Sequence, residues 1–68
     1  SVKFIGTIAS MNYKNGDIVS GRVCEQVSGN CIFFYGREMS CGLKRGDKVR
    51  FTLGENSKGP IASSIVSI

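Results

Sequence analysis

The sequence predicts a small all-β domain in which about five strands close into a barrel. Hydrophobic and polar residues alternate along several segments, and no segment shows the 3.6-residue period of an amphipathic helix. Glycine and polar turn residues separate these segments at short intervals. In a chain of 68 residues, closure into a barrel is the natural way to remove exposed strand edges.

The first two strands are expected to form a hairpin. The first covers residues 2–11, where the even-numbered apolar residues share one face and Gly6 marks a bend or bulge. Residues 12–17 connect the strands, and Asn15-Gly16 favours a type I′ turn, which needs positive φ. The second strand covers residues 18–27. One of its faces carries Val19, Gly21 and Val23.

The third strand is predicted over residues 31–35, which are continuously apolar and aromatic after the cysteine. Such a run is typical of a central strand with one face in the core. We expect Ile32 and Phe34 in the core, which places Phe33 and Tyr35 on the outer face. Aromatic rings exposed on a protein surface often mark an interaction site, so these two residues are candidates for ligand binding.

The second half of the chain predicts a long connection and two more strands. Residues 36–45 are irregular, with room for one short helical turn. Residues 48–53 alternate strictly, which predicts a strand with Val49, Phe51 and Leu53 inward. A polar loop over residues 54–60 leads to a last strand of small and β-branched residues, 61–68.

The composition indicates one globular domain over residues 1–68, which we expect to be a module of a longer protein. The chain is 41% hydrophobic and 21% charged. Its net charge of +4 suits a nucleic acid or another polyanion, and equally an ordinary solvated surface. No apolar run reaches membrane length, so no membrane partner is expected.

The three cysteines predict neither a metal site nor a disulfide framework. Cys24, Cys31 and Cys41 lack CxxC spacing, and the chain contains no histidine. A zinc site would need all three thiolates and a further ligand. We therefore expect reduced thiols in a cytoplasmic protein, with no metal and no cofactor.

Catalysis is the least favoured function, and we expect no enzyme and no catalytic residues. Because the chain contains no histidine, general acid–base catalysis would need its carboxylates. No two of these carboxylates have a spacing that implies a shared site. Asp47 follows Gly46 and precedes a strand, which indicates a turn cap. No serine nucleophile motif or phosphate-binding loop occurs.

Three stretches of the sequence resemble the cold-shock domain, a five-stranded OB-fold barrel. Residues 6–8 with Asn12 are similar to the opening of that family, and residues 32–35 are similar to its second RNA-binding motif. The most specific match is to the C-terminal half of the family. It consists of Leu43, Gly46-Asp47-Lys48-Val49-Arg50-Phe51, Lys58-Gly59-Pro60-Ile61-Ala62 and Val66.

The competing architecture is an SH3-like barrel, which also has about five strands at this length. An SH3-type groove needs several aromatic residues around a proline-binding face, usually with a tryptophan. This chain contains no tryptophan, so the OB-fold is favoured.

The resemblance implies a face on which aromatic rings stack on single-stranded bases, but several rings are replaced here. Ser10 and Met11 stand where the family has two aromatic residues, and residues 15–19 lack both rings of the first motif and contain Asp17. The candidate nucleic-acid-binding residues are three rings and four cations. They are Phe33, Tyr35, Tyr13, Lys14, Arg22, Arg37 and Lys58.

The resemblance therefore implies a divergent repeat, like those of the upstream-of-N-ras translational regulators. We expect a monomeric module of a multidomain RNA-binding protein in translational or post-transcriptional control. Its single-stranded RNA binding is expected to be weak or to need neighbouring domains, with a scaffolding role or a protein partner on the sheet face. The alternative is an autonomous single-stranded RNA- or DNA-binding domain that uses Phe33 and Tyr35.

Overall fold

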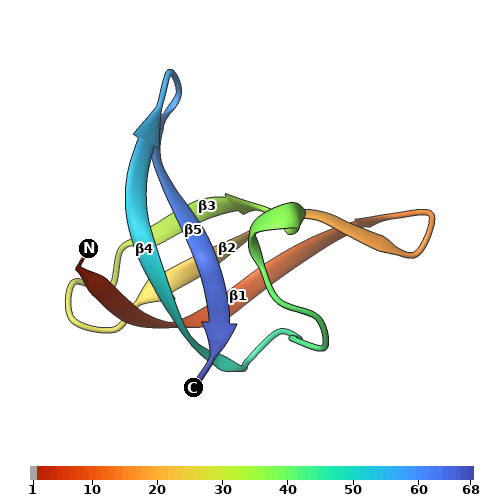
Figure 1. Ribbon diagram of the computed structural model, residues 1–68, viewed down its shortest axis with the longest axis horizontal. Coiled ribbons are helices and arrows are strands. Elements are labelled where there is room, and N and C mark those ends of the chain that lie inside the picture. The colour runs from red at the N-terminus through yellow and green to blue at the C-terminus, as the bar shows by residue number, and fades with distance from the viewer. Residues whose placement is uncertain (1) are drawn as a thin grey trace.

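Five strands form a closed barrel in the order β1-β2-β3-β5-β4 (Figure 1). The computed structural model describes residues 2–68. The elements are β1 (Lys3–Lys14), β2 (Asp17–Glu25), β3 (Cys31–Tyr35), the 3-10 turn η1 (Gly36–Glu38), β4 (Lys48–Asn56) and β5 (Gly59–Ser67). Neighbouring strands are antiparallel except β3 and β5, which pair in parallel. The predicted all-β, five-stranded barrel of the OB type is confirmed.

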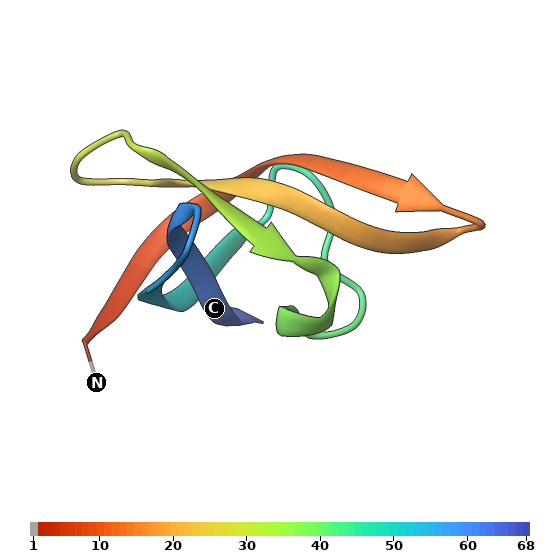
Figure 2. The same ribbon diagram turned by 90° about the horizontal axis from the view of Figure 1, so that it is seen from above.

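The first hairpin is longer than the sequence predicts. Asn15 and Gly16 form the turn with φ of 52° and 83°, as the Asn-Gly pair predicts. Residues 12–14, expected in the connection, belong to β1, which continues to Lys14. Figure 2 shows the hairpin extending beyond the end of β3 as a two-stranded arm.

The barrel is filled by two phenylalanine rings and a surrounding aliphatic layer. Phe34 and Phe51 are fully buried, as predicted, and their neighbours in the core are Ile8, Val23, Ile32, Leu43, Val49, Ala62 and Ile65. Gly21 provides space for one ring, because a Cβ atom there would lie 2.6 Å from Cζ of Phe34. The packing of β2 against the core therefore depends on Gly21 as well as on apolar side chains such as Val23.

Two apolar residues near strand ends, Leu53 from the predicted inward set and Val19, are exposed and not buried. Leu53 is 44% exposed, because the β4–β5 hairpin continues past the barrel mouth (Figure 1). Val19 is 45% exposed, because a register shift between Asn12 and Tyr13 leaves it outside the regular pairing. Alternation predicts the side of the sheet on which a residue lies, but it predicts burial only where another layer covers that part of the strand.

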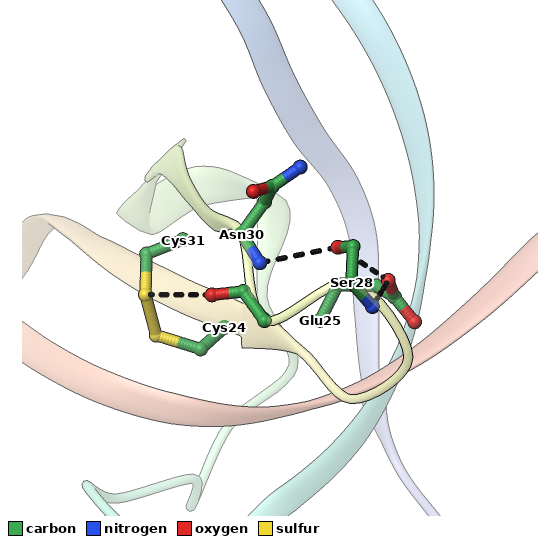
Figure 3. The surroundings of a disulfide bond; sticks show 6 residues. Cys24, Glu25, Ser28, Asn30 and Cys31 are labelled. Carbon is green, nitrogen blue, oxygen red and sulfur yellow. Dashed lines mark hydrogen bonds between the residues drawn. A yellow bond between two sulfur atoms is a disulfide. The ribbon is translucent and has the colours of Figure 1, made fainter.

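The cysteines also differ from the expectation of three reduced thiols. Cys24 and Cys31 are opposite each other on β2 and β3, and their sulfur atoms form a disulfide (Figure 3). Cys41 is free and exposed. The pairing follows from the strand register, which cysteine spacing alone does not reveal.

The turn between β2 and β3 is organised by the buried carboxylate of Glu25 (Figure 3). Its two oxygens accept hydrogen bonds from the backbone N–H groups of Val27 and Ser28, both 2.8 Å, and from the Ser28 hydroxyl at 2.7 Å. These donors explain why β2 ends at Glu25 and not at residue 27.

Acid is expected to destabilise the domain through Glu25. Hydrogen bonds from Val27 and Ser28 hold the pKa of Glu25 below its ordinary value, although burial opposes them. A lowered folded-state pKa stabilises the protein above the ordinary glutamate pKa of about 4.3, and this stabilisation is lost as the pH falls through the folded pKa. Urea denaturation at neutral pH and in acid should show the loss.

The matched control is Glu55→Gln, on an exposed residue of β4. We expect Glu25→Gln to lower stability at neutral pH and to flatten its pH dependence, whereas Glu55→Gln keeps the wild-type dependence. An unchanged acid response in Glu25→Gln would show that other groups cause it.

Candidate nucleic-acid interface

The candidate site is the outer face of β1, β2 and β3. Residues directly opposite each other in antiparallel strands point to the same side of the sheet. The strand registers therefore place three rows on this face. The rows are Thr7, Cys24 and Cys31; Ser10, Arg22 and Phe33; and Asn12, Ser20 and Tyr35. Phe33 and Tyr35 are half-buried and lie on the outer side, as predicted.

The two rings of the outer face contact each other edge to face. The centroids of Phe33 and Tyr35 are 4.9 Å apart, with an interplanar angle of 88°. The guanidinium of Arg37, from η1, lies 4.5 Å from the centroid of Tyr35. One face of Tyr35 is therefore covered by a cation, whose own plane could stack on a base.

A groove of about 220 Å³ runs beside these rings. Its walls are Phe33 and Tyr35 on one side and Asn56, Lys58 and Pro60 of the β4–β5 hairpin on the other. The Asn56 side chain accepts a hydrogen bond from the backbone N–H of Lys58 at 2.9 Å, which fixes the hairpin turn. The structure thus brings together Phe33, Tyr35 and Lys58, which the sequence predicts as binding residues.

Two further predicted residues lie beside this group and two lie apart from it. Arg22 is opposite Phe33 on the outer face, and Arg37 contacts Tyr35. Tyr13 is elsewhere, since its hydroxyl donates to the sulfur of Met11, at 3.5 Å, on the other side of β1. Lys14 is at the tip of the β1–β2 arm, opposite Asp17.

Polar side chains replace rings on the rest of the outer face. Asn12 donates a hydrogen bond from Nδ2 to the hydroxyl of Ser20 at 3.0 Å, in the same row as Tyr35. Met11 points inward and packs against the core, so only Ser10 of the Ser10-Met11 pair is on this face. The remaining rings of the chain lie away from it, which leaves one edge-to-face pair for base stacking.

Sequence reasoning missed Asn56 and Pro60, because they join the groove only through the long-range pairing of β5 with β3. It also missed a neighbouring cavity of about 620 Å³ at the mouth of the barrel. For the hairpin side of the groove, the sequence signal is the Lys58-Gly59-Pro60 stretch of the motif that resembles the cold-shock domain.

Neither a cluster of metal-binding side chains nor a membrane-spanning helix is found in the part of the chain that the structure describes. Residues 2–68 hold no group of three or more acidic or cysteine side chains arranged for a metal ion. No helix among them has the length and apolar character needed to cross a membrane. A scan against protein-family models finds no match for this chain, and a search of curated proteins finds no significant relative.

Proposed function

We propose that this domain is an auxiliary single-stranded RNA-binding module that contacts RNA weakly on its own. The observation that carries the proposal is the small platform on the outer face, formed by Phe33 and Tyr35 in edge-to-face contact. Arg22, Arg37 and Lys58 surround this platform, and rings with adjacent cations are the elements of sequence-tolerant single-strand binding.

The size of the platform limits the affinity. A stacked base contributes about 1–3 kcal/mol, and two rings in edge-to-face contact offer stacking for one or two bases. A dissociation constant of 1 mM already corresponds to about 4 kcal/mol of binding free energy. We therefore expect isolated binding between the high micromolar and the millimolar range.

Weak binding becomes useful when neighbouring modules hold the same strand. Linking two binding modules raises the effective concentration of the second site, so overall affinity rises without new contacts. We propose such a role in a multidomain regulator of mRNA translation, as a monomeric repeat of the cold-shock type. The resemblance over residues 46–51 and 58–62 supports this part of the proposal.

Phe33→Ala is expected to weaken RNA binding about 5- to 150-fold, the equivalent of one stacked base. Chemical-shift titration with a purine-rich RNA hexamer measures the change. Tyr13→Ala is the matched control, because Tyr13 is also an exposed ring but projects from the other side of β1. With three cations near the rings, the logarithm of the binding constant should fall with a slope of about −2 against the logarithm of salt concentration.

Three results would contradict the proposal. Sub-micromolar binding with a steeper salt dependence would make the domain an autonomous nucleic-acid reader. An equal loss in Tyr13→Ala and Phe33→Ala would place the site elsewhere. Absence of RNA shifts at millimolar concentration would favour a protein partner on the outer face.

A further inference from the structure

A cavity of about 620 Å³ opens at the mouth of the barrel, next to the groove, and Arg22, Cys31 and Phe33 of the outer face form one of its sides. It exists because β3 and β5 pair at only two positions, Phe33–Ile61 and Phe34–Ala62. Before Phe33, the first residues of β3 do not pair with the β4–β5 hairpin, so the barrel is open at this end. The apolar walls of the cavity are Phe4, Ile32, Phe33, Leu53 and Pro60.

Arg22 and Glu25 both line this cavity, and Arg22 is the charged group whose donors are free to bind a ligand. For Glu25, the backbone and hydroxyl groups of its own loop occupy both carboxylate oxygens. Arg22 is exposed and forms no ion pair with any residue from 2 to 68. An occupant should therefore combine a flat or compact apolar part with an anionic group.

The cavity continues into the groove that the proposed RNA would follow. Phe33 and Pro60 line both, so a strand that leaves Tyr35 and Lys58 and crosses Phe33 next reaches the mouth. A nucleotide fits its chemistry, because the faces of a base are apolar and its phosphate can pair with Arg22. The amide of Asn30 also lines the cavity, and it can meet the polar edge of a base.

We propose that the mouth cavity binds one base of a single-stranded RNA, with an adjacent phosphate on Arg22. This subsite rests on the proposed function, which it extends from the outer face into the end of the barrel. It adds a recessed apolar contact to a face that offers stacking for only one or two bases. Binding in the mouth depends on Leu53, which lines the cavity but not the groove.

Leu53→Ser tests the proposal, with Val19→Ser as the matched control. The two residues are 44% and 45% exposed, and Val19 is on the β1–β2 arm. The probes are the same RNA hexamer and adenosine 5′-monophosphate. The readouts are the methyl shifts of Ile32 in every variant, the methyl shifts of Leu53 where it is present, and the ring shifts of Tyr35. Leu53→Ser should weaken both probes about fivefold, whereas Val19→Ser should change neither by more than about twofold.

The outcomes separate this inference from the proposed function. RNA shifts at Tyr35 without methyl shifts at Ile32 and Leu53 would overturn the mouth site and leave the outer face intact. Methyl shifts with adenosine monophosphate but no RNA shifts at Tyr35, which lines the groove and not the cavity, would support the mouth and contradict the outer face. Stronger saturation by an acidic, phenylalanine-containing peptide than by the nucleotide would overturn the mouth site in favour of a protein partner.

Discussion

Phe51→Ala is expected to leave most of the protein unfolded at room temperature. The Phe51 ring is fully buried and stacks on Phe4, with centroids 5.9 Å apart, and a Cβ at Gly6 would lie 3.1 Å from it. Removing a buried phenylalanine side chain costs about 3–5 kcal/mol. A core of this size supplies only about 3–5 kcal/mol in total, so the loss is comparable to the whole stability.

Urea denaturation followed by circular dichroism measures this effect. Leu53→Ala is the control on the same strand, because Leu53 is 44% exposed, and we expect it to cost less than about 1 kcal/mol. If Phe51→Ala had the same denaturation midpoint as the wild type, the burial of the Phe51 ring in the core would be contradicted. Equal destabilisation by both variants would mean that the hairpin end is as tightly packed as the barrel centre.

Reduction of the Cys24–Cys31 disulfide is expected to lower stability by about 2–3 kcal/mol. The bond spans a sequence separation of 7, and the chain-entropy relation gives about 2.5 kcal/mol for a loop of this length. In a domain of this size, such a loss lowers the melting temperature by roughly 10–20 °C. Thermal melts with and without a reductant measure the difference.

Serine variants distinguish the disulfide from other effects of the reductant. The Cys24→Ser/Cys31→Ser double variant should melt like the reduced protein and should not respond to reductant. Cys41→Ser should retain the full response, because Cys41 is free and exposed. If three thiols could be alkylated in the unreduced protein, the Cys24–Cys31 pairing would be contradicted. The three cysteines would then be reduced, as the sequence predicts.

Much of the fold could be predicted because it depends on local signals. Alternation in the strand that contains Phe51 and the Asn15-Gly16 turn each reflect neighbouring residues, and both are confirmed. The errors come from non-local geometry. A bulge sets the exposure of Val19, and the cross-strand register joins Cys24 to Cys31.

The candidate site also has a part that could be predicted from local sequence and a part that could not. Phe33 and Tyr35 share an outward face because they are two residues apart on one strand, and this could be predicted from alternation. Tyr13 was expected beside them, but the strand that carries it continues and turns its ring to the other side. The groove and the mouth cavity need the β4–β5 hairpin to approach β3, a contact that no local pattern reports.

The parallel seam between β3 and β5 has a consequence for the order of folding. The β1–β2–β3 meander and the β4–β5 hairpin are each built from contacts between strands close in sequence, whereas β1–β4 and β3–β5 join the two units. Contacts between strands distant in sequence carry the larger loop-closure entropy, so docking of the two units is the slower step. A chain with only the meander formed already carries its two outer rings but lacks the groove, so the groove beside these rings exists only in the fully closed barrel.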